Sequence, residues 1–214
     1  MSQSPGDFPA NPRFARAYLR VAPKAEDRGV REHRRELLAG LTGVVCEVGA
    51  GPGLTFAHYP PAVTQVIAIE PEPTLRAHAE RAAASAPVPV EVRAGVAEAL
   101  PVENASCDAV VLALVLCTVP DPPRALTEVR RVLRPGGTVR VYEHVRSTHG
   151  LVAAAEDLIT PLWARLAGGC HPNRDPVASL ADAGFAVVTV RRFGFGPTRG
   201  LPPVAHVIGR ATRP

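Results

Sequence analysis

Residues 45–53 read VCEVGAGPG and decide the fold of this 214-residue chain. An apolar, β-branched run ends here in a Glu-x-Gly-x-Gly-x-Gly loop, and a short helix-like segment over 54–59 follows it. Gly49, Gly51 and Gly53 allow the backbone to turn sharply and allow a ligand to lie against bare main chain. Many nucleotide-binding folds use such a loop, so by itself it indicates only that broad class of ligand.

An acidic residue at the end of the next strand narrows the choice of ligand. Residues 65–69 read QVIAI and lead into Glu70, which follows the first glycine of the loop by about 20 residues. An acid at the tip of the second strand is placed to bind both hydroxyls of a ribose. The loop and Glu70 together predict an adenosine-type cofactor.

The rest of the chain alternates between strand and helix patterns, which indicates an α/β fold whose parallel strands are joined by right-handed crossovers. Asp121 can cap the helix that follows it, and Pro122 suits the first helical position. Residues 194–203 are too long and turn-rich for a tight hairpin. Strands are predicted at 43–48, 65–69, 88–93, 108–115, 137–143, 185–193 and 204–211, and helices at 76–86, 121–133, 151–168 and 173–183.

The N-terminal part has a different character. Residues 1–12 predict a disordered or draped arm, and residues 13–39 predict one or two charged helices that end near Gly40. We therefore divide the chain into an N-terminal arm with a helical lid (1–39) and a catalytic domain (40–214). Seven arginines and one lysine lie between Arg13 and Glu36, but four acids are interspersed among them. Mixed charge favours a solvated amphipathic helix over a nucleic-acid patch, so no nucleic-acid partner is expected.

The composition and the polar start of the chain predict where in the cell the protein is located. No apolar run reaches about 18 residues, and the polar start lacks a signal-peptide core. The four cysteines show no Cys-x-x-Cys pair, which argues against a disulfide framework or a zinc ribbon. A cytoplasmic protein without a membrane span is expected, as a monomer or homodimer.

Two enzyme classes share the glycine loop and the ribose acid, namely dinucleotide oxidoreductases and S-adenosylmethionine methyltransferases. A short-chain dehydrogenase needs Tyr-x-x-x-Lys, whereas Tyr142 is followed by Arg146 at that spacing. Pro52 also removes one amide donor that a pyrophosphate would use, and S-adenosylmethionine carries no phosphate. These observations favour S-adenosylmethionine.

Three further segments resemble the class I S-adenosylmethionine-dependent methyltransferases. Residues 95–101 (GVAEALP) resemble the loop that holds the adenine, residues 114–119 (LVLCTV) the strand end beside the methyl group, and residues 133–137 (LRPGG) the turn before the fifth strand. The resemblance implies a three-layer, Rossmann-like sheet, mostly parallel, with an antiparallel C-terminal strand. Together with the loop and Glu70, it implies a cofactor site made of Glu47, Gly49, Ala50, Gly51, Gly53, Glu70, Pro71, Val96, Ala97, Glu98, Leu114 and Cys117.

A narrower resemblance covers roughly residues 35–212. Residues 114–145, together with 59–61 (YPP), 169–175 (GCHPNRD) and 206–209 (HVIG), look very like the human methyltransferase-like alkyl thiol S-methyltransferases. The resemblance implies methyl transfer to the sulfur of a small thiol. Those enzymes carry an apolar membrane anchor, whereas this chain begins with a charged segment. Methyl transfer to oxygen, nitrogen or carbon of a small metabolite, or cofactor binding without catalysis, are the alternatives.

For such a transfer, the protein must position the two substrates and supply an ionised nucleophile. A thiol is partly ionised at neutral pH, so a weak base suffices. His144, at the carboxyl edge of the fifth strand, is the candidate base or orienting group, with Glu143 beside it; a purely structural histidine is the alternative. Cys117 is expected to form a small polarizable wall. The acceptor pocket is predicted to contain Cys117, His144, Trp163, His171 and Arg174, under a roof of Leu158, Ile159 and Leu162.

Cys170 and His171, with His144 and His149, raise the question of a metal. Their spacings in the sequence match no compact zinc pattern. Methyl transfer from S-adenosylmethionine to sulfur also needs no metal ion. No metal is expected on these two grounds.

Overall fold

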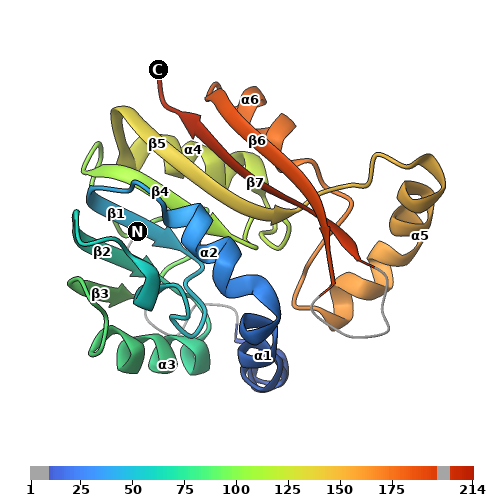
Figure 1. The fold of residues 1–214 in the computed structure, drawn as a ribbon, viewed down its shortest axis with the longest axis horizontal. Coiled ribbons are helices and arrows are strands. Elements are labelled where there is room, and N and C mark those ends of the chain that lie inside the picture. The colour runs from blue at the N-terminus through green and yellow to red at the C-terminus, as the bar shows by residue number, and fades with distance from the viewer. Residues whose placement is uncertain (1–9, 197–202) are drawn as a thin grey trace.

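The computed structural model of the chain describes residues 10–196 and 203–214. Its described part is built on one seven-stranded sheet in the order β3-β2-β1-β4-β5-β7-β6 (Figure 1). Strand β7 pairs antiparallel with both of its neighbours, and the remaining pairs are parallel. The mostly parallel sheet with an antiparallel C-terminal strand is therefore confirmed. The strands are β1 (Gly43–Val48), β2 (Val63–Ile69), β3 (Val90–Arg93), β4 (Cys107–Ala113), β5 (Leu133–His144), β6 (Ala186–Phe195) and β7 (Val204–Thr212).

Helices cover both faces of the sheet, because the central strands are apolar on both sides. Val45 and Val111 face a core that includes Leu37 of α2 and Ala79 of α3. The neighbouring strand positions face a second core against α4 and α6. The helical elements are α1 (Pro12–Ala25), the π-helical η1 (Glu26–Val30), α2 (Arg31–Leu38), the 3-10 turn η2 (Phe56–His58), α3 (Pro73–Ala83), α4 (Pro122–Val132), α5 (Gly150–Leu166) and α6 (Pro176–Asp182).

The order of the strands fixes where a ligand binds. The chain first moves outward from β1 to β3 and then returns to place β4 on the other side of β1. The carboxyl ends of β1 and β4 therefore form the topological switch point, where the crevice of an open α/β sheet lies. The glycine loop follows β1 and residues 114–119 follow β4, so both predicted cofactor segments reach this crevice.

Several predicted boundaries were wrong by a few residues. Strand β5 begins at Leu133 rather than at residue 137, because the LRPGG turn stays against β4 as an irregular start of the strand. Helix α3 begins at Pro73 rather than at residue 76, since the Glu72 carboxylate caps it. Helix α6 begins at Pro176, capped by Asp175, and not at residue 173.

The two chain regions predicted to be irregular are partly ordered. Asn11 caps α1 by accepting a hydrogen bond from the amide of Phe14, so a helix already begins at Pro12. The predicted helix over 54–59 is reduced to the short turn η2. Strand β6 extends to Phe195, into the predicted loop 194–203. The remainder of the predicted arm (1–9) and of that loop (197–202) lies outside the described residues.

Helix α5 stands apart from the other helices. It lies off one edge of the sheet, beyond the end of β5 and the start of β7 (Figure 1). Ala153 and Thr160 are its buried residues, whereas Leu158, Ile159 and Leu162 are 83%, 55% and 61% exposed. These three side chains thus project into solvent, and the predicted apolar roof is not closed by them. Within the described ranges, no helix is both long and apolar enough to cross a membrane.

Candidate active site

The glycine loop is locked between two strands. The amides of Gly49 and Ala50 both donate to the Ile69 carbonyl, at 2.8 and 3.0 Å. Gly49 has a φ of +68°, and a Cβ placed on it would lie 2.7 Å from the side chain of Val115. The first glycine is therefore required both by the backbone conformation and by the close approach of the segment after β4.

Glu70 ties the tip of β2 to this loop. Its buried carboxylate accepts hydrogen bonds from the amides of Gly51 at 2.7 Å and Glu72 at 2.9 Å. Burial raises the pKa of Glu70, and the two amide donors act against that rise. The Arg76 guanidinium donates to the carbonyls of Glu70 and Pro71, at 3.0 Å each. The structure thus places Glu70 and Pro71 at the crevice, beside the glycine loop.

Glu47 belongs to a buried polar network under the loop. The Tyr59 hydroxyl donates to its carboxylate at 2.8 Å, and Thr55 forms a further hydrogen bond with it. Arg34 of α2 donates to the Thr55 hydroxyl at 2.9 Å and to Glu26 at 2.8 Å. Burial raises the pKa of Glu47, while the hydrogen bonds oppose the rise. The network connects α2 to the glycine loop, a link that residue patterns in the sequence did not reveal.

Helix α1 covers the same loop. A Cβ placed on Gly51 would lie 3.7 Å from the Tyr18 ring, and one placed on Gly168 would lie 2.8 Å from the Phe14 ring. The two aromatic rings stack on each other, with centroids 5.7 Å apart. Helix α1 therefore contacts the loop after β1 and the segment after α5 at once.

The predicted adenine loop follows β3. Val96 and Ala99 form a small antiparallel bridge, and Ala97 is buried between them. The Glu98 carboxylate accepts a hydrogen bond from the amide of Asp121 at 3.2 Å, and its carbonyl accepts one from Arg124 at 3.1 Å. The loop is thereby fixed to the start of α4, at the same edge of the sheet as Glu70.

The segment after β4 adopts a strained turn. Leu114 has a φ of +62°, a backbone conformation that residues other than glycine rarely adopt. Its amide donates to the Tyr142 carbonyl at 2.7 Å. The Glu143 carboxylate accepts hydrogen bonds from three consecutive amides, those of residues 115, 116 and 117, at 2.8, 3.0 and 3.2 Å. Burial raises the pKa of Glu143, and these donors oppose the rise. Glu143 thus holds the turn that carries Cys117.

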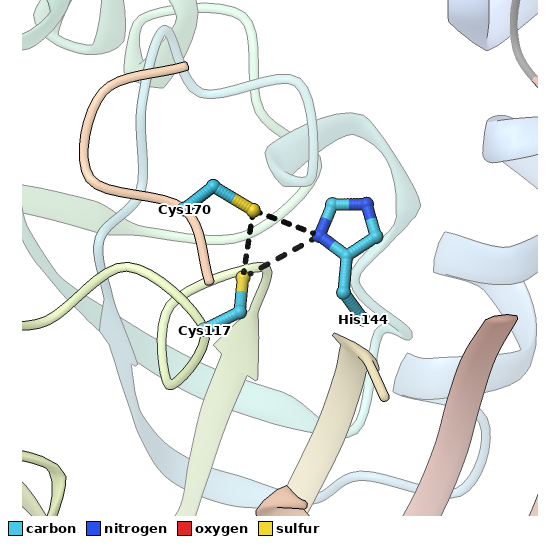
Figure 2. Close-up of side chains that lie close together, drawn as sticks. All are labelled: Cys117, His144 and Cys170. Carbon is cyan, nitrogen blue, oxygen red and sulfur yellow. Dashed lines mark hydrogen bonds between the residues drawn. The ribbon is translucent and has the colours of Figure 1, made fainter. Parts of the chain in front are cut away.

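His144 meets two thiols at the end of β5. Its Nδ1 lies 3.5 Å from the Cys117 Sγ and 3.3 Å from the Cys170 Sγ, and the two sulfurs are 3.8 Å apart. Figure 2 shows that the imidazole nitrogen faces both sulfurs. Both cysteines are buried, and His144 is partly exposed. We call these three residues the Cys-His-Cys cluster.

The pKa values of all three residues in the Cys-His-Cys cluster are shifted from their ordinary values. The contact with the Cys170 thiol, together with burial, raises the pKa of Cys117 to about 12. The same contact lowers the pKa of Cys170 against the effect of burial, with help from the Trp163 indole N–H. Burial works against protonation of His144, but the contact with Cys117 raises its pKa overall. Cys170 is therefore the more acidic of the two thiols.

The other predicted pocket residues surround the cluster in different ways. The His171 amide donates to the Cys117 carbonyl at 2.6 Å. Arg174 donates to the carbonyls of Leu116 and Val119, at 2.8 and 2.7 Å, so its guanidinium braces the turn after β4. Trp163 is 43% exposed on α5 and contacts Cys170, so the structure places it beside the cluster.

The residues at the crevice fit an adenosine cofactor. The glycine loop presents main chain without side chains, and Glu70 places a carboxylate at the tip of β2. The Tyr18 ring lies 3.7 Å from the Cβ position of Gly51. A sugar that accepts hydrogen bonds from amides and donates its hydroxyls to a carboxylate suits this cradle.

Comparison with known proteins identifies the class. Residues 46–141 match the family model of a methyltransferase domain. The chain is 32% identical over 205 residues to human thiol S-methyltransferase TMT1B, covering 90% of this chain and 83% of that protein. It is 36% identical over 146 residues to human thiol S-methyltransferase TMT1A, covering 65% and 59%.

Solved structures share the fold. A methyltransferase from Thermotoga maritima, described as a possible histamine N-methyltransferase, has a TM-score of 0.70 at 24% identity and covers 94% of this chain and 97% of its own. A methyltransferase from Methanosarcina mazei has a TM-score of 0.63 at 23% identity and covers 79% and 92%. The chain belongs to the class I S-adenosylmethionine-dependent methyltransferases. Within that class, the relatives that it matches over most of their length include thiol S-methyltransferases.

Proposed function

We propose that this enzyme transfers the methyl group of S-adenosylmethionine to the sulfur of a small thiol. The observation that carries the proposal is the similarity to thiol S-methyltransferase TMT1B, which extends over 90% of the chain. The Cys-His-Cys cluster supports it, because polarizable sulfur atoms at the end of β5 suit a soft, sulfur-bearing acceptor.

The cofactor would be held by the residues already placed at the crevice. Glu70 would accept the ribose hydroxyls, Val96 and Ala97 would contact the adenine from the loop after β3, and the glycine loop would carry the amino-acid end of the cofactor. The cofactor supplies an activated sulfonium methyl group. Helix α1, with Tyr18 over Gly51, would act as the lid of the site.

The protein's own part in the reaction is to position and ionise the thiol. The acceptor sulfur must lie in line with the methyl carbon and its bond to the sulfonium, near the turn that Glu143 holds. His144 would help to keep the acceptor as a thiolate, and Cys117 would form the wall beside the methyl group. Trp163 and His171 would line the acceptor side. Glu143 is then a positioning residue, since its carboxylate is engaged by backbone amides.

Other acceptors remain alternatives that an assay separates. One relative is a ubiquinone/menaquinone biosynthesis C-methyltransferase, 30% identical over 118 residues, and one structural neighbour is described as a possible N-methyltransferase. A non-catalytic role as a cofactor-binding protein is disfavoured by the match to the enzyme class. The cytoplasmic location, the monomeric or homodimeric state and the absence of a nucleic-acid partner stay predictions.

Transfer of a radiolabelled methyl group to matched small thiols, phenols and amines tests the proposal. We expect transfer to thiols, and we expect His144→Ala to lower turnover most below the thiol pKa, where unaided ionisation is scarce. A positioned base typically contributes ~10²–10⁴-fold, and the defect should shrink at high pH, where the thiol ionises by itself. Transfer to a phenol or amine, with none to any thiol tried, would overturn the sulfur assignment.

A further inference from the structure

The distances within the Cys-His-Cys cluster match those between the ligands of a tetrahedral zinc ion. Zinc binds thiolate sulfur at about 2.3 Å and imidazole nitrogen at about 2.0–2.1 Å. Tetrahedral angles then separate two sulfur ligands by roughly 3.8 Å, and a sulfur from a nitrogen by roughly 3.5 Å. The observed separations are 3.8 Å between the sulfurs and 3.5 and 3.3 Å from each sulfur to Nδ1 (Figure 2).

We propose that Cys117, His144 and Cys170 bind one zinc ion through Sγ, Nδ1 and Sγ, and that the fourth position takes the sulfur of the acceptor. The second half of this inference rests on the proposed thiol acceptor. A set of three protein ligands with one open position is the arrangement of catalytic rather than structural zinc sites, and two cysteines with one histidine are a known donor set.

Three separate elements deliver the ligands, and each is held in place. Cys117 lies on the turn fixed by Glu143 and by Arg174. His144 is the last residue of β5, paired in register with His206 of β7. The segment that carries Cys170 is held against the turn of Cys117, because the amide of His171 donates to the Cys117 carbonyl at 2.6 Å. The three ligands are therefore positioned by hydrogen bonds and strand pairing that do not require the ion.

The donor atoms of the cluster make it selective for a soft cation. Both thiols are shielded from solvent, while His144 is partly exposed. Sulfur and imidazole donors select zinc over the hard cations magnesium and calcium. Coordination through Nδ1 requires the proton of the imidazole to sit on Nε2. Two thiolates neutralise the charge of the ion, so a third thiolate gives an anionic complex that attracts the sulfonium.

The reaction balances with zinc in this role. With the ion bound, His144 acts on the acceptor as a zinc ligand and not as a free base, and the acceptor thiol gives its proton to solvent as its sulfur binds the ion. A lone pair on that sulfur forms a bond to the methyl carbon, and the bond between this carbon and the sulfonium sulfur breaks with both electrons passing to the leaving sulfur. The products are a methyl thioether and S-adenosylhomocysteine, and the neutral thioether is the weaker ligand. No oxidant or reductant takes part.

A second pair of cysteines provides a matched control. The thiols of Cys46 and Cys107 hydrogen-bond to each other, and both residues are fully buried in the core. Replacing either by alanine removes a buried thiol while leaving the Cys-His-Cys cluster intact. Any zinc held nonspecifically by buried thiols would be lost in both sets of variants.

The test measures zinc in the full chain, purified with reductant and after exposure to added zinc. We expect one zinc per chain, and X-ray absorption at the zinc edge should report two sulfur ligands at about 2.3 Å and at least one nitrogen at about 2.0–2.1 Å. Cys170→Ser and His144→Ala should each lower the affinity for zinc by about 100-fold or more, whereas Cys46→Ala and Cys107→Ala should leave it unchanged. Circular dichroism checks that each variant is folded.

Addition of an acceptor thiol should add a third sulfur to the zinc shell. Chelation should abolish thiol methylation, and zinc should restore it. A folded protein that holds no zinc and methylates thiols equally before and after chelation would overturn the metal site while leaving the proposed function intact. Zinc bound by this ligand set, in a protein that methylates phenols or amines but no thiol, would overturn the proposed function and the role of the fourth position.

Discussion

The two sides of the crevice are built in different ways. The side proposed for the cofactor consists of β1, the glycine loop, β2 and Glu70, all within residues 43–70, and its contacts join neighbouring strands. The side proposed for the acceptor joins Cys117, His144 and Cys170, and its two cysteines are 53 residues apart along the chain. One side is a compact local unit, whereas the other exists only after β4, β5 and the segment between α5 and α6 have packed together.

A shared device links the two sides. On each side, a buried carboxylate accepts backbone amides of the turn that follows a neighbouring strand. Glu70 holds the glycine loop by one amide of that loop, and Glu143 holds the turn after β4 by three. Each buried amide donor left unsatisfied costs free energy. The turn after β4 therefore depends more strongly on Glu143 than the glycine loop depends on Glu70.

The largest expected effect comes from Glu143→Ala. Three buried amides would lose their acceptor, and each such loss costs about 1–3 kcal/mol. We expect the free energy of unfolding to fall by about 3 kcal/mol or more, because the strained Leu114 turn would lose its support. Chemical denaturation followed by circular dichroism measures it. Glu143→Gln, which keeps one carbonyl acceptor, should lose less, and equal stability of all three proteins would refute the role of this carboxylate.

The next effect tests the cofactor side. Glu70→Ala removes the charged acceptor proposed for the ribose hydroxyls. Hydrogen bonds to charged groups are worth about 1.5–3 kcal/mol, so the affinity for S-adenosylmethionine should fall roughly 10- to 150-fold. Calorimetry on the folded variant gives the affinity. Glu91→Ala, at an exposed carboxylate on the neighbouring strand β3, serves as the control. Unchanged affinity in Glu70→Ala would contradict the assignment of the ribose site.

The difference between the two sides also explains what the sequence could predict. The glycine loop and Glu70 lie close together in the chain, and strand, turn and acid carry local signals, so the strand 43–48 and the position of Glu70 follow from residues alone. The cap at Asp121 was predicted for the same reason, and its carboxylate accepts the amide of Arg124.

The acceptor side carries no comparable local signal. Spacing along the sequence argued against a metal, and it did not reveal that the fold brings one ligand atom each from Cys117, His144 and Cys170 within 4.8 Å of one another. Three-dimensional convergence of distant residues is invisible to spacing rules. Likewise, the pattern of α5 suggested a roof, but the helix lies at the end of the sheet, where its apolar side chains meet solvent.

The smallest expected effect concerns the segment that carries Cys170. Asp175 caps α6 directly after this segment, accepting the amides of Val177 and Ala178 at 3.0 and 3.1 Å, and Arg192 donates to it at 3.1 Å. Burial opposes ionisation, but these donors lower the pKa of Asp175 below its ordinary value of 3.8. The stabilisation is therefore complete above pH 3.8 and is lost as the pH falls through the lowered value, so a neutral-pH experiment measures all of it.

At pH 7, Asp175→Ala should lower the free energy of unfolding by about 1 kcal/mol, the usual cost of a lost helix cap, and Asp175→Asn by only a few tenths. If the acceptor side is assembled from separately fixed segments, Asp175→Ala should also raise KM for the acceptor thiol while the affinity for S-adenosylmethionine stays unchanged. Denaturation and steady-state kinetics measure the two quantities. An equal loss on both substrates would show that the two sides of the crevice form one cooperative unit, because loosening α6 would then reach the glycine loop as well.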